Sequence, residues 1–202
     1  MNAIVKILSA LTYPFLMPFY AFSVFYGMER QAYYYSVETS LYYYSFVFLL
    51  LVIIPLYVCY LFKKVDVFSS VSPVKTSARV SVILAMLLSN VFLCLVMRKE
   101  NFSSYGVFAI FQIFIALSVI CVIQFKRFLI NPFSLFCGGL SGFVILLGHI
   151  TGADVFWPFC ISVLVFSVAA FARMSIEQLP FNKLVAGYFV GMAVGVLLMC
   201  FY

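Results

Sequence analysis

Seven long apolar stretches alternate along the chain with short segments in which the charged residues gather. Each stretch has about 20 residues, which is the length that an α-helix needs to cross the ~30 Å hydrocarbon layer of a bilayer. Inside that layer a chain must satisfy its own backbone hydrogen bonds, so we expect these stretches to be helical. They are Ala3–Gly27, Leu41–Phe62, Val80–Met97, Tyr105–Phe125, Phe133–Ile150, Val155–Ala172 and Leu184–Tyr202.

Local signals refine two of these stretches. Pro14 and Pro18 each remove a backbone donor from the first stretch, so we expect this span to be kinked or re-entrant. The turn Thr151–Asp154 is short enough to force the fifth and sixth stretches into an antiparallel hairpin. The sequence therefore predicts an all-α, polytopic bundle of about seven transmembrane helices, with residues 1–202 forming one integral membrane domain.

Composition leads to the same fold class without any segment boundary. Hydrophobic residues make up 66% of the chain and charged residues only 9%, whereas about a quarter of an average soluble domain is charged. One soluble domain of 202 residues could not bury so much apolar surface, so the excess is expected to face lipid. The first stretch contains Lys6 but no A-x-A cleavage pattern, which favours a retained span over a signal peptide.

Lysine and arginine are unequally divided between the two ends of the predicted bundle. With seven spans, nine of them fall on the side of the N-terminus, and only Arg30, Arg98 and Lys99 fall on the other side. Because cytoplasmic loops carry the excess of these residues, we expect the N-terminus to lie in the cytoplasm and Tyr202 to lie outside. The outer interface would then hold Trp157 and two runs of tyrosines, Tyr33–Tyr35 and Tyr42–Tyr44, because aromatic rings are favoured there.

Glycines recur at helical spacing in the fifth and seventh stretches. A small residue at every fourth position lets a neighbouring helix backbone approach closely, so helix packing is the expected role. Close approach of a ligand is the alternative for Gly138 and Gly139, which lie near the basic side of the membrane. The six glycines are Gly138, Gly139, Gly142, Gly187, Gly191 and Gly195.

Few side chains within the stretches could perform chemistry. A charge at the bilayer centre costs at least ~2.5 to 3.5 kcal/mol and is usually retained for function, and the sequence predicts no buried ionisable group. Asn90, Gln112 and Gln124 are expected to form hydrogen bonds between helices. His149 could act with Asp154 as an acid and base, although a solvated or capping histidine is the more frequent case.

The six cysteines lie far apart inside apolar stretches, with no C-x-x-C pair and no metal-ligand spacing. We interpret them as small apolar side chains and expect no disulfide, metal or cofactor.

Three loops on the N-terminal side bring pairs of cations to one end of the predicted bundle. Converging cations suit a phosphate ligand, although the positive-inside bias and attraction to anionic headgroups explain most of such a pattern without any site. The candidate phosphate-binding residues are Lys75, Arg79, Lys126, Arg127, Arg173 and Lys183.

Segments at this end resemble signatures of the type-2 phosphatidic acid phosphatase superfamily. The third signature of that family is S-R-x5-H-x3-D, commonly followed by V-x-x-G. The run that begins at Ala172 and Arg173 and ends at Gly187 is similar to it. Leu179 stands where the signature has histidine, and Lys183 stands where it has aspartate.

Two further segments extend this resemblance. The run Ile130–Phe133, followed by a glycine-rich stretch, looks like the P-S-G-H signature with Phe133 in place of the histidine. Tyr13–Tyr20 is similar to the start of small membrane proteins of Bacteroidetes-type bacteria that look like distant relatives of these phosphatases. Lys75 and Arg79 lie where the K-x6-R-P signature is expected, with a different spacing and no proline.

The resemblance covers roughly Ile130–Tyr202 and implies a phosphatase-like core in the C-terminal half. In the family, one histidine attacks phosphorus and another protonates the leaving alcohol, while lysine and arginine neutralise the phosphate oxygens. Phenylalanine and leucine cannot do either step. The resemblance therefore implies binding of a lipid phosphate, or of a membrane protein partner, without histidine-based hydrolysis. Well-known bacterial members place this site outside the cytoplasmic membrane, whereas the charge count places it inside.

Two other functions stay open at this point. An active lipid phosphate or diphosphate phosphatase with substituted machinery would release inorganic phosphate. A small transporter or channel subunit would need a continuous polar path, which the apolar stretches do not indicate. The expected partners are membrane lipids, with lipid phosphates among them, or a membrane protein, and no nucleic acid.

Overall fold

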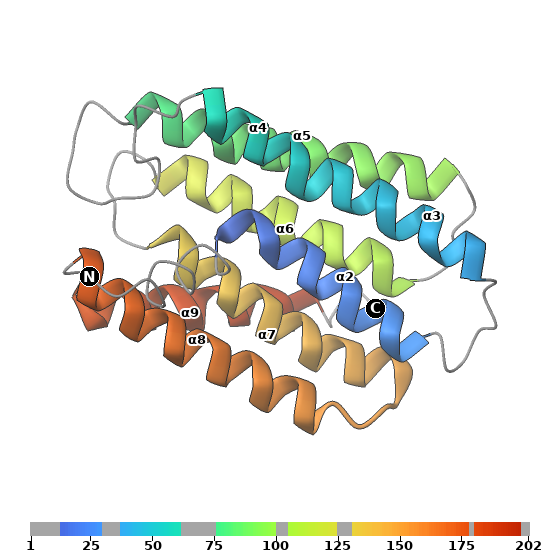
Figure 1. Cartoon of the computed structure of the whole chain (residues 1–202). Coiled ribbons are helices and arrows are strands. Elements are labelled where there is room, and N and C mark those ends of the chain that lie inside the picture. The colour runs from blue at the N-terminus through green and yellow to red at the C-terminus, as the bar shows by residue number, and fades with distance from the viewer. Residues whose placement is uncertain are drawn as a thin grey trace.

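The computed structural model describes residues 13–29, 37–61, 76–99, 105–124, 131–177 and 180–198. These residues are helical almost throughout and contain no strand, so the predicted all-α class is confirmed. The helices lie side by side, with α4 and α5 along one edge of the bundle and α8 along the other (Figure 1).

Seven helical rods make up the described part of the chain. The first follows a short 3-10 turn, and the second runs without a break from α3 through a π-helical turn into α4. The elements are η1 (Pro14–Leu16), α2 (Met17–Glu29), α3 (Val37–Phe48), η2 (Leu49–Ile53), α4 (Ile54–Leu61), α5 (Thr76–Lys99), α6 (Tyr105–Ile123), α7 (Pro132–Thr151), α8 (Phe156–Glu177) and α9 (Phe181–Leu197).

Five of the described helices are long and apolar enough to cross a membrane. They match the second to the sixth predicted stretches, and their ends differ from the predicted ends by a few residues. The seventh stretch forms α9, which is apolar but has only 17 residues in the described range. The prediction of several membrane-spanning helices is thus confirmed for these five.

The first apolar stretch is interrupted at its prolines. Tyr13 has an extended backbone (φ −62°, ψ 141°), because proline disfavours the helical conformation in the residue before it. Helix α2 begins only at Met17, and its 13 residues extend about 20 Å, less than the ~30 Å hydrocarbon layer. A single straight helix over Ala3–Gly27 is therefore excluded, as the prolines predict, and residues 3–12 lie outside the described ones.

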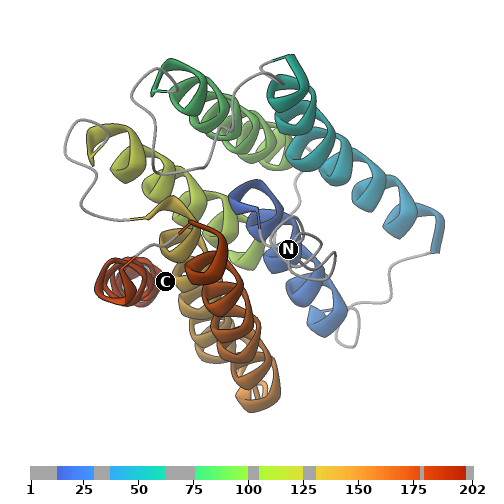
Figure 2. The same cartoon turned by 60° about the vertical axis from the view of Figure 1, so that its left-hand side comes forward.

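Helix α7 occupies the centre of the bundle. Within the apolar stretch of α7 that is long enough to cross a membrane, 78% of the residues are buried inside the protein, whereas the corresponding share in α8 is 28%. It packs against α2, α6, α8 and α9 (Figure 2). The connection to α8 is the predicted hairpin, in which Gly152 adopts a left-handed conformation (φ 65°) and its N–H donates to the Gly148 carbonyl oxygen at 2.9 Å.

Helices α7 and α9 meet backbone to backbone at glycines. A Cβ atom at Gly195 would lie 2.7 Å from the Cα atom of Gly142, closer than side-chain atoms approach. A Cβ atom at Gly191 would overlap the carbonyl oxygen of Leu135. These positions run in the same order along both helices, so α9 lies parallel to α7, while α8 returns between them in the chain.

We expect Gly191→Ala to lower the stability of the detergent-solubilised protein by about 1–3 kcal/mol, because the added methyl group would push α9 away from α7. Gly27→Ala is the matched control, since nothing lies within 4 Å of the Cβ position there. Thermal unfolding of both variants tests this, and equal melting temperatures would contradict the close contact of the two helices.

Candidate functional site

Several helix ends gather on one side of the bundle. Figure 1 shows the starts of α5 and α7 and the ends of α6 and α8 on the same side. The guanidinium of Arg173, near the end of α8, lies over the ring of Phe133 in the first turn of α7. We call this side, defined by Phe133 and Arg173, the basic end. The segments predicted to carry the phosphate ligands all adjoin it along the chain.

Arg173 is the one charged side chain among the described residues that is buried, with an exposed fraction of 1%. Its Cζ atom lies 4.5 Å from the ring centroid of Phe133 and 5.6 Å from that of Tyr13. Both distances fall within the ~6 Å over which a ring face attracts a cation. The prediction of no buried ionisable group is therefore wrong. Helix α8 continues past the predicted end at Ala172 to Glu177, so Arg173 lies inside the helix and its side chain is covered.

Arg173 lies near one end of the candidate membrane span Phe156–Ser175. Trp157, in the first turn of α8, is 70% exposed, as is usual for an aromatic side chain at a membrane interface. From Trp157 to Arg173 the helix rises about 24 Å at 1.5 Å per residue. That is most of the ~30 Å hydrocarbon thickness. A helix α8 that crosses the layer with Trp157 at one interface would therefore carry Arg173 close to the other.

Local hydrogen bonds hold the start of α7 beneath Arg173. Asn131 caps the helix: its Oδ1 atom accepts a 2.9 Å hydrogen bond from the N–H of Phe133. The hydroxyl of Ser134 donates to the Asn131 carbonyl oxygen at 2.9 Å, and Pro132 occupies the first turn, where its missing N–H costs nothing. The positive end of the α7 dipole therefore lies at the basic end together with the guanidinium, and both favour an anion.

A row of stacked rings continues from Phe133 into the bundle. The ring centroids of Phe133 and Phe166 are 6.1 Å apart, and those of Phe166 and Tyr188 are 4.2 Å apart. The ring planes are inclined by only 22° and 21°. Because the three residues belong to α7, α8 and α9, this row fixes the relative positions of the helices that form the basic end.

The hydroxyl of Tyr188 begins a buried chain of hydrogen bonds. It donates to Ser141 Oγ at 2.8 Å, and Ser141 Oγ lies 2.9 Å from Ser162 Oγ. Ser162 donates to the Phe159 carbonyl oxygen at 2.7 Å. When Ser141 donates to Ser162, every hydroxyl proton has an acceptor. These hydrogen bonds involve no histidine or carboxylate that could activate a serine as a nucleophile, so their role is to join the helices.

The other predicted phosphate ligands are exposed or are not described. Lys183 is exposed in the first turn of α9. Arg79 lies in the first turn of α5, but its side chain falls outside the described residues. Lys75, Lys126 and Arg127 fall outside them entirely. The convergence of six cations on one site therefore stays a prediction.

Gly138 and Gly139 are covered by neighbouring helices. A Cβ atom at Gly138 would overlap the Tyr188 carbonyl oxygen of α9, and one at Gly139 would overlap the Leu117 side chain of α6. The space beside both glycines is filled by protein, which excludes the alternative that a ligand approaches them directly in this conformation. Gly187 is likewise buried in α9.

The polar residues singled out elsewhere make local contacts. Asp154 Oδ1 accepts a 2.9 Å hydrogen bond from the N–H of Phe156 at the start of α8, and His149 is exposed. Asn90 Nδ2 donates to the Met86 carbonyl oxygen of its own helix at 2.7 Å, so the hydrogen bond that it makes is not the predicted one between helices. No three His, Cys, Asp or Glu side chains in the described ranges are grouped as metal ligands.

Tyr13, Phe166 and Ser141 lie at or near this site, although none of them is a predicted ligand. Tyr13 contacts Arg173 from the far end of the chain, and the resemblance of their segments to one family does not predict this contact. The nearest signal for Tyr13 is the following Pro14, which predicts a break in the helix but not the partner of the residue before it.

Comparison of the chain with protein-family models, curated proteins and solved structures gives no match. The class of the protein therefore rests on its own fold. With five apolar helices of membrane-spanning length, the chain is a multi-pass α-helical membrane protein.

We expect Ser141→Ala to destabilise the protein more than Tyr188→Phe does. The first change leaves the buried Tyr188 donor without its acceptor, at a cost of about 1–3 kcal/mol. The second leaves no donor unsatisfied and removes one hydrogen bond, worth about 0.6 kcal/mol within membranes. Ser167→Ala is the control, because that exposed hydroxyl bonds only to the Val163 carbonyl of its own helix. Thermal unfolding in detergent measures the order, and the reverse order would refute this hydrogen-bond chain.

Proposed function

We propose that the protein binds an anionic membrane lipid through its phosphate group, with Arg173 as the main ligand, and does not hydrolyse it. The observation that carries this proposal is the burial of Arg173, 1% exposed, near the end of the candidate membrane span Phe156–Ser175. A charge buried in a membrane protein is costly and usually marks a functional site. Arginine is also suited to phosphate, because its planar fork of N–H groups matches two phosphate oxygens at once.

The surroundings of Arg173 support this role. Phe133 and Tyr13 lie against the guanidinium as ring contacts, and such stacking is compatible with hydrogen bonds in the guanidinium plane, where its N–H groups lie. The start of α7 adds a positive partial charge beside the same place. A phosphate at Arg173 would therefore meet two independent sources of positive potential.

We further propose that this arrangement descends from the type-2 phosphatidic acid phosphatases. The contact between Phe133 and Arg173 supports the kinship, since the two signatures that these residues would represent must meet at one site in that family. The same contact argues against hydrolysis, because a phenyl ring stands where a proton-transferring histidine would be needed. Leu179, at the other histidine position, lies outside the described residues.

We propose that the basic end faces the cytoplasm of a bacterial cell. The excess of lysine and arginine on the N-terminal side supports this orientation. With an odd number of spans, alkaline phosphatase fused after Tyr202 should then be active and green fluorescent protein fused there should be dark. A fluorescent fusion at that position would contradict the proposed orientation.

Native mass spectrometry of the protein released from nanodiscs tests the binding proposal. In nanodiscs of phosphatidylcholine with added phosphatidate, we expect an adduct with phosphatidate in the wild type. We expect Arg173→Ala to weaken it by about 10- to 100-fold, since a hydrogen bond to a charged group contributes about 1.5–3 kcal/mol. Arg173→Lys should bind at an intermediate level, because it keeps the charge and loses the planar fork.

Arg98→Ala is the matched control, because Arg98 is an exposed arginine at the far end of α5, away from the basic end. Equal phosphatidate binding by the wild type and both alanine variants would contradict the proposal and favour a scaffold for a protein partner. Release of inorganic phosphate from phosphatidate that disappears in Arg173→Ala would instead establish the active phosphatase. Circular dichroism of each variant separates loss of binding from loss of folding.

A further inference from the structure

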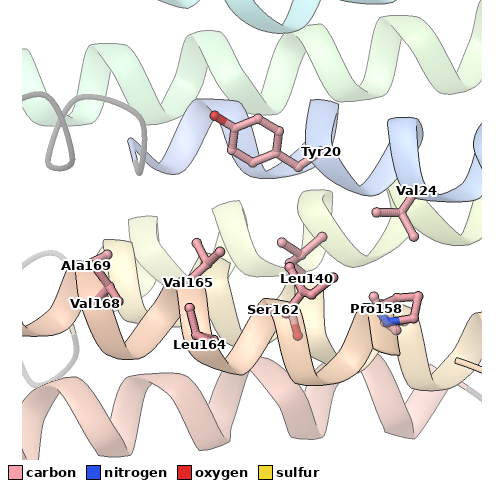
Figure 3. A pocket seen from close by; sticks show the side chains of 11 residues that line it. Tyr20, Val24, Leu140, Pro158, Ser162, Leu164, Val165, Val168 and Ala169 are labelled. Atoms are coloured by element: carbon pink, nitrogen blue, oxygen red, sulfur yellow. The ribbon is translucent and has the colours of Figure 1, made fainter. Parts of the chain in front are cut away.

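A groove lies between α2 and α8, which both pack against α7 (Figure 3). Tyr20 and Val24 of α2 line one side of the groove, and Val165 of α8 and Leu140 of α7 line the side that faces α2. The groove has a volume of about 470 Å³, which is within the roughly 300–1,000 Å³ of typical ligand pockets.

The lining of the groove suits hydrocarbon. Ser162 and Tyr20 carry the only hydroxyl groups among the lining residues. The hydroxyl of Ser162 is already engaged with Ser141 and with the Phe159 carbonyl oxygen. Apart from Tyr20, the other lining side chains are aliphatic, so along most of the groove a polar ligand group would lose its hydration without gaining partners.

The groove lies within the membrane-spanning part of α8. Its lining on that helix extends from Pro158 to Ala169, and both residues belong to the candidate span Phe156–Ser175. This distance is about 16 Å along the helix axis, roughly half of the ~30 Å hydrocarbon layer, and the lining ends about 6 Å before Arg173 on the same helix. The groove therefore opens toward acyl chains and not toward water.

Arg173 follows the groove lining on one face of α8, one helical turn beyond the last lining residue. Residues four apart on a helix are neighbours on one face, and the lining residues Val165 and Ala169 are followed at that spacing by Arg173. The same helix face thus joins an apolar groove to a buried cation one turn beyond it. The two features match the two parts of an anionic lipid, a hydrocarbon chain and a charged headgroup.

We infer that the groove holds one hydrocarbon chain of the anionic lipid whose phosphate binds at Arg173. This inference rests on the proposed function and defines its ligand as a phosphate lipid with a long chain rather than a soluble phosphate. A helix from a partner or a second copy is a poorer fit. A helix 16 Å long and about 10 Å in diameter occupies more than twice the groove volume of about 470 Å³.

Photocrosslinking tests the inference with two probes in phosphatidylcholine nanodiscs: a phosphatidate with a diazirine in one acyl chain, and a diacylglycerol with the same chain. In the wild type, the phosphatidate chain should crosslink to the facing walls of the groove, around Leu140 and Val165. Val165→Trp fills the groove and should lower this yield about tenfold, equivalent to about 1.4 kcal/mol. Phe171→Trp is the matched control, because Phe171 is 74% exposed on the same helix and does not line the groove.

The two proposals fail in different ways. Chain crosslinks spread equally over the exposed face of α8, including Phe171, would overturn the groove assignment, while an Arg173-dependent phosphatidate adduct would leave the proposed function standing. If phosphatidate and diacylglycerol crosslink in the groove with equal yield, and Arg173→Ala does not change that yield, the groove does not select a lipid whose phosphate binds Arg173. That result would overturn both the phosphate site at Arg173 and its connection to the groove. Crosslinks at Leu140 and Val165 that favour phosphatidate and need Arg173 support both.

Discussion

The contact between the backbones of α7 and α9 is the constraint on which the rest of this bundle depends. Glycines at the crossing let the helices touch without side chains between them, at Gly142 and Gly195 among other positions. Helix α8 is tied by short connections to the end of α7 and to the start of α9, so it must lie near both. The row of stacked rings and the buried chain of hydrogen bonds from Tyr188 then join all three helices. This packing brings the end of α8 over the start of α7 and places Arg173 against Phe133.

The energetics of Arg173 show why it can stay buried before a ligand arrives. Insertion of a charge at the bilayer centre costs about 2.5–3.5 kcal/mol, and less toward the interface. Each contact with a ring face returns about 0.5–2 kcal/mol, the larger value when the pair is shielded from water. The rings of Phe133 and Tyr13 therefore offset much of the cost. Phosphate binding would add charge-assisted hydrogen bonds to a guanidinium that the protein already holds in place.

The sequence was sufficient for those features that depend on short segments. Apolar runs of membrane length located five helices within a few residues, the short Thr151–Asp154 turn predicted the hairpin, and Pro14 predicted the break at Tyr13. Burial of Arg173 was not predictable in this way, since hydropathy falls at this residue and the rings that cover it come from Tyr13 and Phe133, far away in the chain. The groove was equally hidden, because it arises from the gap that α2 and α8 leave on α7 and not from any pattern within one helix.

Solid-state NMR in nanodiscs containing phosphatidate can detect a lipid phosphate at the guanidinium of Arg173, through the dipolar coupling between lipid ³¹P and arginine side-chain ¹⁵N nuclei. We expect a coupling at hydrogen-bonding range that assigns to Arg173 and is absent from Arg173→Lys. Close contacts that assign only to exposed arginines such as Arg98, with none at Arg173, would contradict it.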